Sequence, residues 1–435
     1  MINSLFDFSS ESTLLYETSC KIKYKNEEYH GRAKIKFEFL PKDKILIYTE
    51  FDNPQVSSLI DKQDEITFFI NNYKIDAYII SSQLQLQPVL SELKWISKNA
   101  NLTLKLNKEK NTKYIIFHLF NFFNFIDYNK LIPLDNGGFK ISETVFELKN
   151  YLVTIQSLQK TSENIKIIRE KGISRITQVG RVEKKDGNNI SIEEYKELEE
   201  LIMYFFSFTK GSWINPSCSF GLDENNESTY YMLNTPRSEW KSLSSWFEPT
   251  HNSLNMQIMK NLFFLFAELW ENEDWQETLK GVIYWFINAN DGSRGVDTGL
   301  ILAQTALEKL SFEYVVNNKK LLSTKGFKDI WASDKFRLLF SSLNIPLDIP
   351  SDLKILTKEA KQHNWLDAPH ALTEIRNSLV HPEHKKHGKF DIYAYIEAHK
   401  LSLWYLEVSI LAICKFDGIY SNRVKRGKIE NVPYI

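Results

Sequence analysis

The stretch A-L-T-E-I-R-N-S-L-V-H-P-E-H, from Ala371 to His384, indicates both a local fold and a chemistry. Its apolar residues recur at helical intervals and predict an amphipathic helix with one apolar stripe. These residues are Leu372, Ile375, Leu379 and Val380. Pro382 cannot continue a helix and disfavours helical dihedral angles at the residue before it. We therefore expect the helix to end at Val380 or His381, which makes His381 a terminal residue.

Arg376, Asn377 and His381 form the candidate catalytic set on this helix. On a continuous helix, Arg376 and His381 would lie about 140° apart, but a helix that ends at His381 lets the imidazole turn toward Arg376. The negative end of the helix dipole favours a protonated imidazole. Arginine offers a planar cationic fork to phosphate, and histidine titrates closest to neutral pH. The pair therefore suits metal-independent cleavage of RNA.

The hexapeptide R-N-S-L-V-H, Arg376 to His381, resembles the R-polar-x-x-x-H signature of HEPN ribonuclease domains. A helical segment with A-L-E-K-L at Ala306 to Leu310 precedes it, and a long last helix ending in F-D-G-I-Y-S-N-R follows. This arrangement is similar to that of the ApeA-like HEPN proteins of bacterial abortive infection. The similarity covers residues 255 to 425, and the aromatic, strand-rich N-terminal half also resembles the companion domain of that family.

The resemblance implies a metal-independent endoribonuclease that acts without a cofactor in anti-phage abortive infection. Two protomers would pair through their helical domains in the cytoplasm and build one composite cleft. Arg376 would stabilise the pentacovalent phosphate, and His381 would act as general acid or base while the ribose 2′-hydroxyl attacks. Asn377 would orient the imidazole or the phosphate. Lys385 and Lys386 would bind the RNA backbone beside the cleft. The expected substrate is host or phage RNA, with tRNA as one candidate, and the N-terminal domain would restrain the nuclease or recognise a phage-derived trigger.

Two other readings compete with catalysis. HEPN-like bundles include members that bind nucleotides, RNA or proteins without cleaving them. Clustered aromatic residues between the two halves of the chain also suit a carbohydrate-binding β domain on a helical scaffold, although packing at a domain junction is the favoured explanation. These residues are Trp213, Tyr230, Tyr231, Trp240 and Trp246. Glu308 is either an accessory to the active site or a partner in a salt bridge with an adjacent helix.

A metal site is not expected at the H-x-x-H-x-x-H series formed by His381, His384 and His387. Pro382 interrupts the helical spacing that metal ligands require, and the lysines within the series would place positive charge beside the ion.

Composition limits the classes of protein that the chain can represent. A length of 435 residues predicts two or three domains, and a formal net charge of −1 restricts nucleic-acid binding to local patches. The three cysteines, Cys20, Cys218 and Cys414, form no C-x-x-C pair, which favours a reducing cytoplasm over a disulfide framework. The first residues lack the features of a signal peptide, and no apolar run approaches the length of a membrane span, so no membrane association is expected.

The periodicity divides the chain into two parts and predicts an α+β fold. Residues 1–250 read as an antiparallel β-rich domain, a sandwich or open barrel, with strands such as His30–Leu40, Lys44–Phe51 and Tyr73–Ile80. S-I-E-E at Ser191 predicts a capped helix near residues 191–208. The basic segment Lys160 to Lys185 reads as a strand surface, either bound to phosphate or, preferably, solvated with glutamates that cancel part of its charge.

Residues 251–435 show the 3.6-residue period of an all-α, HEPN-like bundle, with the boundary placed at His251 to Ser253. The predicted helices are Leu254–Leu269, Trp275–Ala289, Asp297–Val316, Phe327–Leu343, Ser351–His363, Ala368–Val380 and Asp391–Tyr420.

Overall fold

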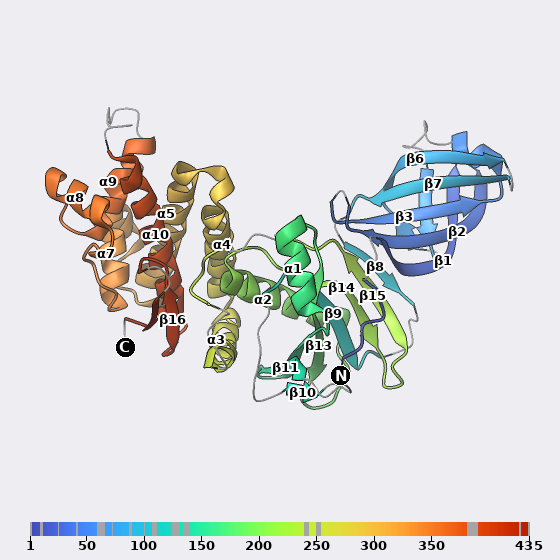
Figure 1. Cartoon of the computed structure of the whole chain (residues 1–435), viewed down its shortest axis with the longest axis horizontal. Coiled ribbons are helices and arrows are strands. Elements are labelled where there is room, and N and C mark those ends of the chain that lie inside the picture. Colours follow the sequence, from blue (N-terminus) through green and yellow to red (C-terminus); the bar gives the residue numbers. More distant parts are fainter. Residues whose placement is uncertain are drawn as a thin grey trace.

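The computed structural model places antiparallel sheets in the N-terminal part of the chain and helices in the C-terminal part, so the predicted α+β class is confirmed. Figure 1 shows an elongated molecule, in which a seven-stranded sheet, an eight-stranded sheet and a helical region follow one another along the long axis. The structure describes residues 2–8, 12–24, 26–40, 42–58, 66–71, 73–86, 89–99, 101–106, 111–123, 131–133, 139–238, 243–248, 254–380, 390–425 and 428–433.

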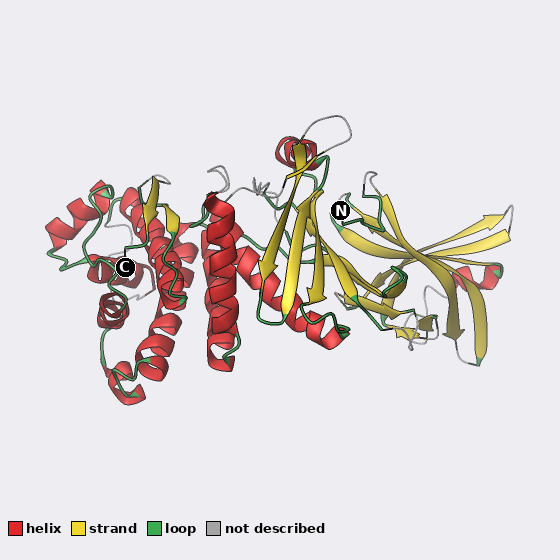
Figure 2. Ribbon diagram, turned by 90° about the horizontal axis from the view of Figure 1, so that it is seen from below, coloured by secondary structure: helices red, strands yellow, loops and turns green. Residues whose placement is uncertain are grey.

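The seven-stranded sheet has the order β5-β4-β1-β2-β3-β7-β6, and its paired strands are antiparallel. Its strands are β1 (Ser12–Tyr24), β2 (Glu27–Glu38), β3 (Lys44–Phe51), β4 (Ile66–Ile70), β5 (Tyr73–Ile75), β6 (Ala77–Leu86) and β7 (Val89–Ser97). Only Asp76 separates β5 from β6, yet β5 pairs with β4 and β6 pairs with β7. The continuous stretch Tyr73–Leu86 therefore supplies the strands at both edges of the sheet. The strands of this sheet curve strongly (Figure 2).

The eight-stranded sheet has the order β10-β11-β12-β13-β9-β14-β15-β8. Its strands are β8 (Asn101–Lys105), β9 (Tyr114–Phe120), β10 (Leu131–Pro133), β11 (Phe139–Glu147), β12 (Tyr151–Ser157), β13 (Ile176–Lys184), β14 (Ser217–Leu222) and β15 (Ser228–Asn234). Two helices belong to this part of the chain, α1 (Thr161–Lys171) and α2 (Ile192–Lys210). We call this sheet with α1 and α2 the central β region.

The predicted helix near residues 191–208 is confirmed as α2, and its capping box is present. The Ser191 hydroxyl accepts a hydrogen bond from the Glu194 amide, and the Glu194 carboxylate accepts one from the Ser191 amide. The prediction of a strand surface over Lys160–Lys185 is wrong for its first half. That half forms α1, with acidic Glu163 in the first turn, basic residues in the last turn and left-handed Gly172 at its C-cap.

The helical region comprises α3 (Leu254–Trp270), α4 (Glu273–Asn290), η3 (Gly292–Arg294), α5 (Val296–Phe312), η4 (Glu313–Asn318), α6 (Thr324–Asp329), α7 (Ala332–Ser342), α8 (Lys354–His363), α9 (Ala368–Val380) and α10 (Ile392–Ile413). A small hairpin follows, formed by β16 (Ile419–Asn422) and β17 (Lys428–Asn431). The predicted boundary at His251 to Ser253 lies outside the described residues, so the proposed division at residue 250 stays a prediction.

Two predicted helices differ from the structure by more than a few residues. The segment Phe327–Leu343 is not one helix, because extended backbone at Ile330 and Trp331 separates α6 from α7. The last helix does not reach Tyr420. It ends at Ile413, Lys415 adopts the left-handed conformation with φ 57°, and the Phe416 amide donates to the Leu411 carbonyl.

Each face of the eight-stranded sheet contributes to a different hydrophobic core. On β9, Ile115, Phe117 and Leu119 pack with α2 and the helical region, whereas Ile116 and Phe120 pack with the seven-stranded sheet. The second core also contains Ile2, Phe6 and Phe8 from the start of the chain. Because successive strand residues point to opposite faces, one strand holds the two cores together.

Candidate functional site

The motif helix α9 has the predicted bounds, Ala368 to Val380, and buried polar contacts from three helices fix its position. Gln304 on α5 donates to the Leu372 carbonyl at 2.6 Å. The Arg337 guanidinium on α7 pairs with Asp367, directly before α9. On the C-terminal half, the Ser378 hydroxyl lies 3.1 Å from the Tyr395 hydroxyl of α10. The backbone that carries Arg376 is therefore held from several sides.

Arg376 and Asn377 are half-buried neighbours near the end of α9. Arg376 Nη1 donates to Asn377 Oδ1 at 3.5 Å, and Arg376 forms no ion pair with any residue in the described part of the chain. His381, Lys385 and Lys386 lie outside the described residues. Of the predicted site residues, the structure thus brings together Arg376 and Asn377.

Glu308 takes the structural role among its two predicted alternatives. Its carboxylate lies 2.6 Å from the Lys335 ammonium on α7, which also lies over the Phe327 ring at 5.0 Å. This interhelical salt bridge occupies the carboxylate, so Glu308 is engaged between α5 and α7.

The aromatic residues at the junction of the two halves mostly pack rather than form an open platform. Trp213, Tyr230 and Trp246 are buried, and the Arg237 guanidinium lies over the Trp213 ring at 3.8 Å. Trp240 lies outside the described residues. These three side chains are therefore packed in the interior, and the domain junction stays a prediction.

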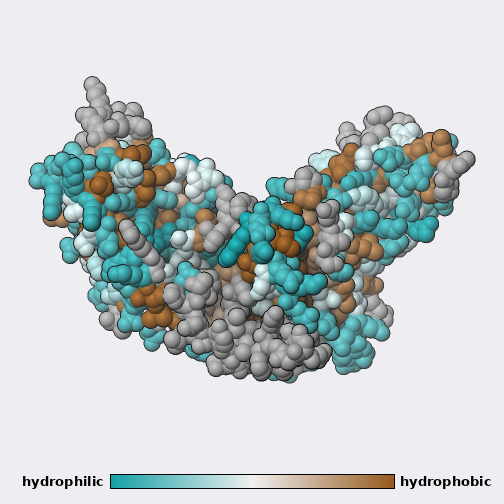
Figure 3. Space-filling view, viewed as in Figure 1, coloured by the Kyte–Doolittle hydropathy of each residue, from teal (hydrophilic) through white to brown (hydrophobic). Residues whose placement is uncertain are grey.

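Four basic side chains of the segment Lys160 to Lys185 pair with neighbouring carboxylates. Lys166 pairs with Glu170 along α1 at 3.8 Å, and Arg181 pairs with Glu183 at 2.9 Å. Lys184 and Lys185 each pair with a glutamate of another element, at 2.6 and 3.4 Å. Figure 3 shows hydrophilic residues gathered over α1, at the floor of a hollow between the two ends of the molecule. The four ion pairs cancel part of the positive charge of the segment.

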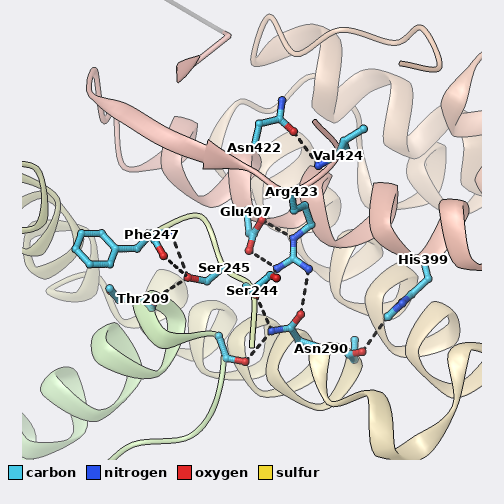
Figure 4. Close-up of polar contacts among 12 residues, drawn as sticks. Thr209, Ser244, Ser245, Phe247, Asn290, His399, Glu407, Asn422, Arg423 and Val424 are labelled. Carbon is cyan, nitrogen blue, oxygen red and sulfur yellow. Dashed lines mark hydrogen bonds and ion pairs between the residues drawn. The ribbon is translucent and has the colours of Figure 1, made fainter. Parts of the chain in front are cut away.

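A buried polar cluster joins the central β region to the helical region (Figure 4). We call it the Arg423 cluster; it consists of Gly211, Ser244, Asn290, Glu407 and Arg423. Arg423 Nε donates to Glu407 Oε2 at 2.8 Å, and Nη2 donates to the other carboxylate oxygen. Glu407 is 0 % exposed and Arg423 7 %, so the pair is removed from water. Burial raises the pKa of Glu407, and the Arg423 guanidinium opposes that shift.

The remaining polar groups of the Arg423 cluster also have partners. Arg423 Nη1 donates to Asn290 Oδ1 at 3.0 Å, and Nη2 donates to the Ser244 carbonyl at 2.9 Å. Asn290 Nδ2 donates to the carbonyls of Gly211 and Ser244, at 2.8 and 3.0 Å. Sequence reasoning missed this cluster, although one signal was present. Glu407 interrupts the apolar run of α10, and a carboxylate in such a place requires a cationic partner.

Neither a metal site nor a membrane span is found in the part of the chain that the structure describes. No group of three His, Cys, Asp or Glu residues there could hold a metal ion. No helix there combines the length and the apolar character needed to cross a membrane. The series His381, His384 and His387 lies outside this part.

Comparisons with known proteins connect the chain to a protein encoded by a prophage. Residues 107–242 match the model of the YopA central domain, and residues 272–432 match the model of the YopA C-terminal domain. The chain is 27% identical over 435 residues to the SPbeta prophage-derived uncharacterized protein YopA of Bacillus subtilis (strain 168). That alignment covers 97% of this chain and 94% of the prophage protein. No solved structure matches the chain.

Most of the site residues described above fall within the two matched ranges. Arg376 and the pair Arg423–Glu407 fall within the C-terminal match, and Gly211 falls within the central match. Residues 243–248, which contain Ser244, lie between the two ranges.

Proposed function

We propose that the chain is a metal-independent endoribonuclease of the HEPN type. One observation carries the proposal: Arg376 projects from an anchored helix and, within the described ranges, has no carboxylate partner. A guanidinium whose backbone is fixed and whose charge is not neutralised is suited to bind a phosphate through two parallel hydrogen bonds. The proposal also draws on the resemblance of R-N-S-L-V-H to the HEPN signature.

In the proposed reaction, the ribose 2′-oxygen attacks the adjacent phosphorus. A bond forms between the 2′-oxygen and phosphorus, and the bond from phosphorus to the 5′-oxygen breaks, which leaves a 2′,3′-cyclic phosphate. Arg376 stabilises the charge that develops on the pentacovalent phosphate, and Asn377 orients the phosphate or the imidazole. His381 transfers the proton, as acceptor from the 2′-hydroxyl or as donor to the leaving 5′-oxygen.

A homodimer is part of the proposal, because a composite cleft needs a second motif helix. An exposed apolar face on α10 supports it. Ile392, Tyr393 and Ile396 are 62%, 61% and 42% exposed, and they share a helix with Tyr395, which contacts Ser378 of α9. Apolar side chains gathered in this way mark protein–protein contact surfaces more often than free surface.

The biological setting is proposed from the relative and from the cysteines. A prophage-derived relative is compatible with anti-phage abortive infection, in which host or phage RNA such as tRNA is cleaved after a phage-derived trigger is sensed. The three cysteines are buried and unpaired, as suits the reducing cytoplasm.

The test is RNA cleavage in EDTA by the purified full-length protein, together with growth arrest on expression. We expect Arg376→Ala and His381→Ala each to lower cleavage about 100-fold or more, the usual effect of losing a phosphate-stabilising or proton-transferring group. Arg376→Lys should recover only part of the activity, because lysine lacks the planar fork. Arg294→Ala, an exposed arginine in the same region, is the control and should cleave like the native chain. Equal activity of all variants would leave the non-catalytic binding module as the explanation.

A further inference from the structure

Residues 243–248, here called the strap, lie between the two ranges that match family models, yet three of them pack into the protein core. Ser245, Trp246 and Phe247 are buried. The Ser245 hydroxyl donates to the Thr209 carbonyl of α2 at 2.6 Å, and the Trp246 carbonyl accepts from the Ser421 amide of β16 at 2.7 Å. The strap therefore contacts the central β region on one side and the helical region on the other.

Asn290 is the residue at which the two sides meet (Figure 4). Its amide nitrogen donates to Gly211, at the end of α2, and to Ser244 in the strap. Its amide oxygen accepts from Arg423, which is bound to Glu407 of α10. His399 of α10 adds a second contact beside it, at 2.9 Å from the Ala289 carbonyl. One asparagine side chain thus connects α2 and the strap to α10.

Helix α10 extends from this connection to the motif helix. Glu407 and Tyr395 are twelve residues apart on α10, which corresponds to about 18 Å along a rigid helix. The Tyr395 hydroxyl lies 3.1 Å from the hydroxyl of Ser378, two residues after Arg376. A shift of α10 at the Arg423 cluster must therefore displace either this hydrogen bond or α9 itself.

We propose that the Arg423 cluster is a latch, through which the central β region sets the position of the motif helix α9. A buried ion pair adds little net stability compared with apolar side chains of the same size, but it specifies one geometry. The proposal requires a second, open arrangement, in which water replaces the polar bonds of Asn290. This inference concerns the position of α9 and holds whatever chemistry Arg376 performs.

The test removes only the hydrogen bonds that Asn290 donates to Gly211 and to Ser244. In Asn290→Asp, one carboxylate oxygen still accepts from Arg423, while the other opposes the carbonyls of Gly211 and Ser244. We expect backbone amides of the strap and of residues 376–380 to exchange hydrogen about tenfold faster or more, as for the loss of two buried hydrogen bonds. Asn288→Asp is the matched control. It places the same charge near the end of α4, but its amide donates to Tyr284 within the helix.

A double-mutant cycle with Tyr395→Phe tests the path through α10. Tyr395→Phe removes the contact with Ser378, so the additional effect of Asn290→Asp on residues 376–380 should largely disappear in that background. Faster exchange confined to the strap, unchanged exchange everywhere, or an undiminished effect in the Tyr395→Phe background would each overturn the latch. If Asn290→Asp does not fold, hydrogen exchange is measured in Ser245→Ala, with the same expected and contradicting outcomes. This variant loses the hydrogen bond to Thr209 and the one from the Phe247 amide.

Discussion

Acidification from pH 7 to pH 5 should destabilise the protein by about 2 kcal/mol through His118 alone. His118 lies on β9, fully buried between the two sheets and surrounded by aromatic rings. Its Nδ1 donates to the carbonyls of Ser217 and Cys218, and its Nε2 lies 2.8 Å from the Ser4 hydroxyl oxygen. Burial lowers the pKa of His118 from 6.5 to about 4, and the two carbonyls only partly oppose the shift.

The sign and the size follow from the two pKa values. The unfolded chain binds the proton near pH 6.5, whereas the folded protein binds it only near pH 4. Stability is therefore complete above pH 6.5 and falls as the pH drops through this window. Each pH unit within it removes about 1.4 kcal/mol, which amounts to about 2 kcal/mol at pH 5 and about 3 kcal/mol at pH 4.

The assay is urea unfolding followed by circular dichroism at both pH values. His118→Gln cannot titrate, so its free energy of unfolding should fall about 2 kcal/mol less than that of the native chain between pH 7 and pH 5. His30→Gln changes an exposed histidine on β2 and should show the native pH dependence. The reasoning is refuted if His118→Gln loses as much stability on acidification as the native chain does.

Three further predictions concern other parts of the molecule. Burial raises the pKa of Glu199 from 4.5 to about 7, so the protein loses stability as the pH rises through that range. Glu199→Gln should therefore stabilise the protein by roughly 1–2 kcal/mol at pH 8, whereas the control Glu197→Gln, at an exposed position, should not. Gly180→Ala should destabilise by about 2 kcal/mol or more in thermal unfolding, because the added carbon would lie 2.1 Å from a phenylalanine ring of the paired strand β9. Ile392→Asp combined with Ile396→Asp should shift a dimer to monomer in sedimentation; an unchanged sedimentation coefficient would remove this face from the proposed interface.

Local signals were sufficient for several elements. The apolar stripe and the following proline gave both ends of α9, and the capping box gave the start of α2. Strand β3 matches its prediction residue for residue, because buried and half-buried side chains alternate from Ile47 to Phe51. In each case the deciding interactions lie within a few residues of one another, where periodicity and caps are visible in sequence.

Other elements depend on contacts that spacing does not reveal. Strand β1 was not predicted, because a register shift between Leu14 and Tyr16 interrupts its period-two pattern. Helix α1 was mistaken for a strand because charged residues are interleaved with its isoleucines, whereas left-handed Gly172 ends a helix there. For the candidate site, the sequence placed Arg376 and Asn377 on one helix end. It could not pair Arg423 with Glu407 or with Asn290. These residues lie 16 and 133 residues away from Arg423 in sequence, beyond the reach of local patterns.

The strand orders of the two large sheets govern when this protein can fold during its synthesis. The neighbours β1–β2, β2–β3, β4–β5 and β6–β7 can form as soon as their own residues leave the ribosome. Strand β8, however, pairs with β15, and β9 pairs with β13 and β14. The nascent chain must therefore hold β8 unpaired until Asn234 emerges, so a pause or truncation before that residue exposes apolar strands to aggregation.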